Sequence, residues 1–223
     1  MEDRIKEIFM ELGADICGIA NIERFTDAPS GFHPADIYEE CKSVVVFAKC
    51  MPKGLAWVSP RNVYIKATDT NLNELDRISY LGSIEIEKLG GIAVPMPSDS
   101  PYEYWDSDNL EGRGLLSMKH AALLAGIGSM GKNTLIINKK YGNMLNMGAV
   151  LTNLDLKSDP FSEKMCIDGC RLCLDSCPQK ALDGQTANQK LCREYTYGNN
   201  KRGFPVCNCN KCRVVCPRSL GER

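Results

Sequence analysis

The sequence has no long run of apolar residues, and this absence limits where the protein works. No segment approaches the roughly 18 consecutive apolar residues that a membrane-spanning helix requires. The first residues, Met-Glu-Asp-Arg-Ile-Lys-Glu-Ile, form a charged amphipathic segment and not the apolar stretch of a signal peptide. Neither charge is in excess, because 27 basic and 28 acidic residues give a net charge of -1. The net charge gives no overall reason to expect nucleic acid or an anionic membrane as a partner, and we expect a cytoplasmic protein without membrane contact.

Cysteine, by contrast, is plentiful near the end of the chain. Nine of the twelve cysteines lie between Cys166 and Cys216, and they contain the one internal repeat, two runs that both end in Cys-Pro. The runs are Cys170-x2-Cys173-x3-Cys177-Pro178 and Cys209-x2-Cys212-x3-Cys216-Pro217. In bacterial-type ferredoxins such runs hold two [4Fe-4S] clusters, and the cysteine before proline in each run is a ligand of the other cluster. The spacing therefore predicts two cubane clusters.

Eight of these cysteines make two complete sets of four ligands. The predicted first set is Cys166, Cys170, Cys173 and Cys216, and the predicted second set is Cys177, Cys192, Cys209 and Cys212. Two members depart from the usual pattern: three residues separate Cys166 from Cys170 where the usual gap is two, and Cys192 stands alone. Cys207 is left over, and it is the substitute if either of them is not a ligand.

Zinc and disulfide bonds are the alternatives for these cysteines. A Cys-x2-Cys pair suits zinc, but zinc sites rarely use a Cys-Pro crossover, and eight thiolates would need two separate tetrahedral sites. Disulfides need an oxidising compartment, which the start of the chain gives no reason to expect. We therefore expect iron-sulfur clusters and, with them, sensitivity to oxygen.

The cysteine-rich segment also carries a local excess of positive charge. Between Lys190 and Arg218 there are seven Lys or Arg residues and one acid, Glu194. Three interpretations stay open: the charges offset those of the thiolates and clusters, they dock an acidic electron donor, or they contact RNA.

Residues 1–157 are predicted to form an α/β (α+β) lobe, and residues 158–223 a smaller lobe that holds the metal. Apolar residues at helical spacing predict a helix that ends at Gly13, followed by a strand from Asp15 to Ala20. The β-branched run from Ser43 to Lys49 predicts a strand buried on both faces at the centre of a sheet. Further predicted elements are a helix at 66–89 that Gly82 interrupts, a strand at 92–96, a loop at 97–114, a helix at 115–125, and strands at 134–138 and 147–152.

A glycine loop follows the helix predicted at 115–125. Gly126, Gly128, Gly131 and Lys132 match the spacing of a nucleotide-binding P-loop, but Asn133 replaces the Ser or Thr whose hydroxyl would bind magnesium. A P-loop also follows a strand and opens a helix, whereas here a helix precedes the loop and a strand follows it. ATP binding is therefore not expected. The glycines allow close approach of the backbone either to a cofactor or to a neighbouring strand.

Residues 117–138, Ser-Met-Lys-His-Ala-Ala-Leu-Leu-Ala-Gly-Ile-Gly-Ser-Met-Gly-Lys-Asn-Thr-Leu-Ile-Ile-Asn, continue into Gly-Ala-Val-Leu-Thr-Asn-Leu at 148–154 and then into the double Cys-Pro tail. This combination resembles the epoxyqueuosine reductase family, which is related to the reductive dehalogenases. The resemblance implies a nitroreductase-like lobe that binds cobalamin, with a flavin as the alternative, and a ferredoxin-like lobe with two [4Fe-4S] clusters that pass electrons to the cofactor. Nitroreductase-like lobes often pair, so a homodimer is one of the oligomeric states left open.

The resemblance also implies site residues. Gly126, Gly128, Gly131, Lys132 and Asn133 would contact the organic cofactor. An acidic residue supplies a proton in this family, and the best match to its Asp-Ser-Ala-Pro-like turn is Asp99, with Asp106 as the competitor. A carboxyl group that acts as a general acid needs a raised pKa, which burial beside an apolar cofactor would provide.

Two departures from the family bear on the substrate. Ser129 and Asn133 stand where the family usually has Trp and His, so we expect a changed pocket wall. The sequence ends soon after Cys216, whereas epoxyqueuosine reductases continue into a helical-repeat lobe that helps hold tRNA, and this weakens the expectation of a tRNA substrate. We expect a reductase of a small organic substrate that receives electrons from a ferredoxin or flavodoxin. The alternative is an electron-transfer protein without an organic cofactor.

Overall fold

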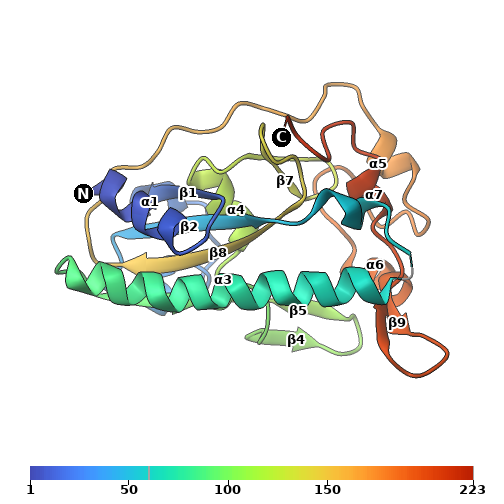
Figure 1. Ribbon diagram of the computed structural model, residues 1–223, viewed down its shortest axis with the longest axis horizontal. Coiled ribbons are helices and arrows are strands. Elements are labelled where there is room, and N and C mark those ends of the chain that lie inside the picture. Colours follow the sequence, from blue (N-terminus) through green and yellow to red (C-terminus); the bar gives the residue numbers. More distant parts are fainter. Residues whose placement is uncertain (60, 223) are drawn as a thin grey trace.

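A four-stranded antiparallel sheet forms the centre of the molecule (Figure 1). The computed structural model describes residues 1–59 and 61–222. The strand order is β1 (Ile16–Asn21), β2 (Ser43–Cys50), β8 (Leu145–Thr152) and β3 (Ala93–Met96). Strand β2 pairs with β1 on one side and with β8 on the other. The prediction that the β-branched run occupies the centre of the sheet is confirmed.

Both faces of β2 are covered, because its side chains alternate between two apolar clusters. Val44 and Val46 point to the cluster that contains helix α4 (Met118–Leu124). Val45 and Phe47 point to the cluster formed with α1 (Glu2–Glu11) and α3 (Asn62–Lys88). Residues 43–48 are all buried, which explains why this strand is apolar throughout and not alternating.

Helix α3 runs through residue 82 without a break, so the predicted interruption at Gly82 is wrong. Gly82 is buried against α1, and a Cβ atom added to it would lie 2.4 Å from Cζ of Phe9. The Phe9 ring packs in turn on Phe47, with ring centroids 4.9 Å apart. A glycine is therefore needed at position 82 because α1 and α3 approach closely there. The packing around Gly82 keeps helix α3 continuous.

The stretch at 97–114, predicted as a loop, contains a β-hairpin formed by β4 (Tyr104–Asp106) and β5 (Glu111–Arg113). The Asp106 carboxylate closes its turn by accepting hydrogen bonds from the backbone amides of Asp108 and Asn109, at 2.9 and 3.1 Å. A turn of this kind can form from Asp and Asn residues that are close in sequence. The strands were not predicted because they are short and most residues of the stretch are polar.

The remaining elements are short. They are η1 (Ile22–Phe25), α2 (Pro34–Ile37), η2 (Lys53–Ala56), β6 (Ser129–Met130), β7 (Ile136–Ile137), α5 (Leu172–Asp175), α6 (Gln189–Thr196), β9 (Tyr197–Asn199), β10 (Pro205–Cys207) and α7 (Lys211–Val214). The strand predicted at 134–138 is reduced to β7, which pairs with β6.

The cysteine-bearing segment gathers at one end of the molecule, beside the first turns of α3 (Figure 1). The chain reaches it from β8 by a long connection without regular structure. A third apolar cluster joins this segment to the rest, because Cys207 packs with Met51, Tyr64 and Met144. None of the helices in the described ranges is long and apolar enough to cross a membrane.

Candidate metal centre

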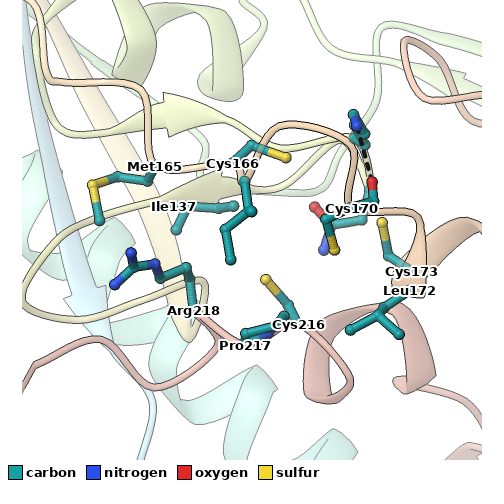
Figure 2. A pocket seen from close by; sticks show the side chains of 12 residues that line it. Ile137, Met165, Cys166, Cys170, Leu172, Cys173, Cys216, Pro217 and Arg218 are labelled. Atoms are coloured by element: carbon teal, nitrogen blue, oxygen red, sulfur yellow. Dashed lines mark hydrogen bonds between the residues drawn. The ribbon is translucent and has the colours of Figure 1, made fainter.

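The four cysteines of the predicted first set line a single pocket (Figure 2). Cys166 and Cys170 lie on the segment before α5, Cys173 lies within α5, and Cys216 follows α7. Burial raises the pKa of Cys216, and the thiols of the other three members raise it further. The chain thus brings together one cysteine of the second Cys-Pro run and two of the first.

The members of the predicted second set lie near enough to one another for three of them to act on the pKa of the fourth, Cys212. Burial raises the pKa of Cys212 to about 11, and the charges that act on it include those of Cys177, Cys192 and Cys209. Cys177 comes from the first Cys-Pro run and Cys216 from the second, so the last cysteine of each run lies near cysteines of the other run. This is the exchange expected of a two-cluster ferredoxin segment.

Cys207 lies away from the pocket of the first set. It is buried, and its Sγ donates a hydrogen bond of 3.5 Å to the carbonyl oxygen of Cys209. Burial raises its pKa, and its neighbours in the third apolar cluster include Met51 and Tyr64. These contacts give the thiol a packing role, and its use as a substitute ligand stays a prediction.

The donor set suits iron-sulfur chemistry. All twelve cysteines are free thiols. Among the residues that the structure describes, no three His, Cys, Asp or Glu side chains are close enough together to hold one metal ion. The thiols of the first set instead surround a pocket that is otherwise lined largely by apolar side chains such as Ile137 and Leu172 (Figure 2). A [4Fe-4S] cluster is bound by cysteine thiolates, and the four cysteines of the first set face one largely apolar pocket.

The glycine loop packs against the protein's own chain. A Cβ atom on Gly126, whose φ is +72°, would lie 2.2 Å from the carbonyl oxygen of Pro160. A Cβ atom on Gly128 would lie 2.6 Å from the carbonyl oxygen of Ile137, and one on Gly131 would lie 2.8 Å from the Ile137 side chain. Of the two uses left open for these glycines, the close approach to neighbouring chain segments is the one that the geometry shows. Their contact with an organic cofactor stays a prediction.

The two residues after these glycines reach the cysteine segments. The Lys132 ammonium donates a hydrogen bond of 2.9 Å to the carbonyl oxygen of Cys170. The Asn133 side-chain amide donates one of 2.8 Å to the carbonyl oxygen of Cys212. The loop therefore contacts one member of each cysteine set.

Asp99 lies at the surface and not in a buried pocket. Its carboxylate accepts a hydrogen bond of 3.1 Å from the Tyr102 hydroxyl, which accepts one of 3.3 Å from Arg193 of helix α6. Hydrogen bonds from the side chain and backbone of Asn109 lower the pKa of the competitor, Asp106. A carboxyl group that is held ionised is a poor proton donor, which argues against Asp106; the role of Asp99 stays a prediction.

Two contacts near the cysteine sets were not predicted, although the sequence named Ser129 for a different role, in the pocket wall. Ser129 Oγ accepts a hydrogen bond of 2.8 Å from the backbone amide of Met165, directly before Cys166. Lys119 of α4 lies near Cys212 and Cys192, and burial together with Arg213 lowers its pKa. No local signal marks either residue, because each meets the cysteine segment only in the folded chain.

The chain is similar in sequence to known proteins over most of its length. No family model matches the chain. An epoxyqueuosine reductase of Bacillus cereus is 30% identical over 220 residues, which covers 86% of this chain and 54% of the relative. One of Listeria monocytogenes is 28% identical over 209 residues, with 85% and 52% covered. The chain therefore spans about half the length of the curated relatives it matches.

Solved structures share the fold at lower identity. The epoxyqueuosine reductase of Streptococcus thermophilus superposes with a TM-score of 0.66 at 20% identity, covering 98% of this chain and 66% of that one. A reductive dehalogenase whose structure suggests a mechanism for B12-dependent dehalogenation superposes with a TM-score of 0.68 at 18% identity, covering 98% and 32%. The mixed α/β arrangement is similar in both.

Proposed function

This chain is a relative of the epoxyqueuosine reductases, as the glycine loop and the cysteine layout predicted, and we propose that it is an iron-sulfur oxidoreductase. In this proposal two [4Fe-4S] clusters take electrons from a ferredoxin or flavodoxin. The electrons serve the reduction of a small organic substrate at a cobalamin.

The observation that supports the proposal is that Cys166, Cys170, Cys173 and Cys216 line one pocket, while Cys177, Cys192 and Cys209 lie near enough to Cys212 to raise its pKa. Cys166, Cys170, Cys173 and Cys216 would hold one cluster, and Cys177, Cys192, Cys209 and Cys212 the other. The clusters would supply one-electron transfer, with potentials set by the charges and hydrogen bonds around their sulfur atoms. Two sets of cysteine ligands in one short segment are more typical of an electron relay than of a single metal site that only stabilises the fold.

The division into lobes belongs to the proposal. Residues 1–157, with the sheet and helices α1, α3 and α4, would be the nitroreductase-like lobe that binds the organic cofactor. Residues 158–223 would be the ferredoxin-like lobe. The Gly112 amide donates a hydrogen bond of 3.0 Å to Gln189 Oε1 of α6, and Gln189 Nε2 donates one of 3.1 Å to the Gly112 carbonyl oxygen. This pair of bonds joins the second lobe to the hairpin of the first.

The cobalamin is proposed from the relationship alone. The related reductive dehalogenase is described as B12-dependent, but Pro160 and Ile137 occupy the space beside the glycines of the loop, so their packing does not by itself support contact with a corrinoid. We therefore assign no contact between this loop and the cofactor. Asp99 is our candidate for the proton donor, since Tyr102 and Arg193 link it to the segment that carries Cys192.

The packing of the glycine loop favours one second candidate, an electron-transfer protein without an organic cofactor. Lys132 and Asn133 hydrogen-bond to the cysteine segments and line the pocket of the first cysteine set. In that case the α/β lobe would serve to dock a protein partner, and the clusters would pass electrons to it.

Anaerobic purification followed by iron, sulfide and cobalt analysis separates these functions. About eight irons per chain are expected for two clusters. Cobalamin and then flavin are added, and binding is followed by the absorption spectrum and by reduction through the clusters. Stoichiometric binding of a corrinoid whose cobalt is reduced supports the reductase, while full iron content without binding of either cofactor supports the electron carrier.

The substrate class needs its own assay. An epoxyqueuosine reductase of the same fold was crystallised with an epoxyqueuosine-modified tRNA stem loop. The reduced protein is therefore offered that stem loop beside small epoxides and organohalides. Turnover of a small compound but not of the stem loop supports the proposal, and turnover of the stem loop alone contradicts it.

A further inference from the structure

One turn of the chain lies between the two cysteine sets and contacts both. Lys132 Nζ donates to the carbonyl oxygen of Cys170, a member of the first set, at 2.9 Å. The next residue, Asn133, donates through Nδ2 to the carbonyl oxygen of Cys212, a member of the second set, at 2.8 Å. Neighbouring residues thus hold backbone groups that are 38 and 79 positions away in sequence.

This turn is held firmly by its own hydrogen bonds. The backbone amide of Gly131 donates to the carbonyl oxygen of Leu135, and that of Thr134 donates to the carbonyl oxygen of Gly131, both at 2.8 Å. Asn133 is 3% exposed, and its Oδ1 accepts from the Leu135 amide at 3.3 Å. With both ends of its side-chain amide engaged, Asn133 has little freedom, and the turn fixes where the cysteine backbones lie.

The two contacts differ in charge. Lys132 and Arg218 are the two cations that line the pocket of the first set, together with its four cysteines. Asn133 brings no charge to the second set. A cation beside thiolate-bound iron favours the reduced, more negative state, so the turn should affect the two clusters differently.

We propose that Lys132 and Asn133 are positioning residues for the two clusters. Lys132 raises the reduction potential of the cluster held by the first set, and Asn133 fixes the backbone that carries Cys212 of the second. This inference rests on the proposed function, because it requires both clusters. Lys132 and Asn133 complete the P-loop-like spacing of the glycine loop. In this proposal they act in the electron relay and not in nucleotide binding.

The test of Lys132 is a potentiometric titration of the anaerobic protein followed by electron paramagnetic resonance. Lys132→Met should make reduction of one cluster about tenfold less favourable, which is about 59 mV for one electron, and leave the other cluster unchanged. Lys132→Arg keeps the charge and should retain the parent potential. Lys139→Met removes an exposed charge from the same region and should change neither cluster.

The test of Asn133 uses Asn133→Asp, which keeps the shape and replaces the donor amide by an acceptor. It should alter the potential or the resonance spectrum of the cluster that Lys132→Met leaves unchanged. The matched control is Asn199→Asp on the exposed strand β9, which should alter neither cluster. If a variant loses iron, loss of about four irons, from one cluster only, also supports a positioning role.

The outcomes separate this inference from the proposed function. Unmutated protein with about four irons or fewer per chain overturns both, because each requires two clusters. Full iron content with unchanged potentials in Lys132→Met overturns this inference alone. Equal shifts of both clusters, or a shift of the same size in Lys139→Met, also overturn it, because they reflect only the overall charge of the protein.

Discussion

At the scale of single residues, Cys192 and Cys207 have opposite surroundings. Cys192 is exposed on α6 and lies near Cys212. Cys207 is buried in an apolar cluster and donates to a carbonyl group. A ligand must give up its proton to bind metal, and a thiol packed among Met51, Tyr64 and Met144 is the less suitable of the two.

Serine substitution distinguishes these cysteines. Cys192→Ser should lower the iron content by about four atoms per chain, because it removes one of four ligands of a cluster. Cys207→Ser should keep about eight irons and lower only the stability, since it puts a hydroxyl into an apolar cluster. Iron and sulfide analysis of the anaerobic proteins decides. The opposite pattern would make Cys207 the ligand.

Spacing alone predicted that Cys216 of the second run lies with Cys170 and Cys173 of the first, because the Cys-Pro crossover is a local signal with a known consequence. The places of Cys166 and Cys192 in the ligand sets stay predictions. The roles of Lys132 and Asn133 could not be predicted, since their spacing resembles a P-loop and their partners lie far away in sequence. Ser129 and Lys119 carry no local signal of their contacts with the cysteine segment.

At the scale of elements, the packing of α3 on α1 depends on the missing side chain at Gly82. Alanine is favoured over glycine in a helix by about 1 kcal/mol, but the new Cβ would overlap the Phe9 ring. We expect Gly82→Ala to destabilise the protein by about 1–3 kcal/mol, the usual cost of overpacking. Thermal unfolding under anaerobic conditions measures this as a lower Tm.

The double variant Gly82→Ala/Phe9→Leu serves as the control. It should lose less stability than the sum of the single variants, because the smaller side chain makes room for the methyl group. An increase in Tm for Gly82→Ala alone would mean that helix propensity outweighs the contact.

Helix α1 is fastened to the connection after β8 by a half-buried ion pair. Lys6 Nζ lies 2.8 Å from Asp159 Oδ1, and Asp159 Oδ2 accepts from the Ile19 amide at 2.9 Å. The hydrogen bond to Asp159 raises the pKa of Lys6. A raised pKa means that the stabilisation is complete below the unfolded value of about 10.4 and is lost as the pH rises through the folded value.

Replacing Lys6 should therefore have a pH-dependent effect. Lys6→Met should lower the apparent Tm by about 2–4 °C between about pH 7 and pH 9, corresponding to about 1 kcal/mol. The difference should shrink above about pH 10.4. Lys88→Met removes an exposed partner of Glu85 and should have little effect at any pH. A difference for Lys6→Met that stays constant as the pH rises beyond about 10.4 would exclude the ion pair as its cause.

The main elements followed from the periodicity of apolar residues, which predicted α1, β1, β2, α3, β3, α4 and β8 to within a few residues. The pairing of the strands could not be predicted, because it joins distant segments such as β3 and β8. Helices α5, α6 and α7 are short. Helices of this length are stabilised by long-range contacts more than by local helix propensity, so the sequence did not predict them.

At the scale of the whole molecule, the two ends of the chain should respond differently to loss of metal. The apolar clusters on the two faces of the sheet use residues up to 156, whereas the cysteine segment has few regular elements of its own. Removing the iron with a chelator should expose sites after residue 157 to trypsin while a fragment of about residues 1–157 persists. Mass spectrometry of the digest identifies the cuts, and the iron-loaded protein is the control. Early cuts within 1–157 would contradict this division.

Helix α3 also limits how this molecule can change during evolution. It is an uninterrupted helix of 27 residues, about 40 Å long at about 1.5 Å per residue. Its first turns pack beside the segment that carries Cys207, and its later turns pack on the sheet (Figure 1). Each residue turns the helix by about 100°. Loss or gain of one residue would therefore rotate one end against the other and present the wrong side chains there, so this helix can change in length only by nearly whole turns.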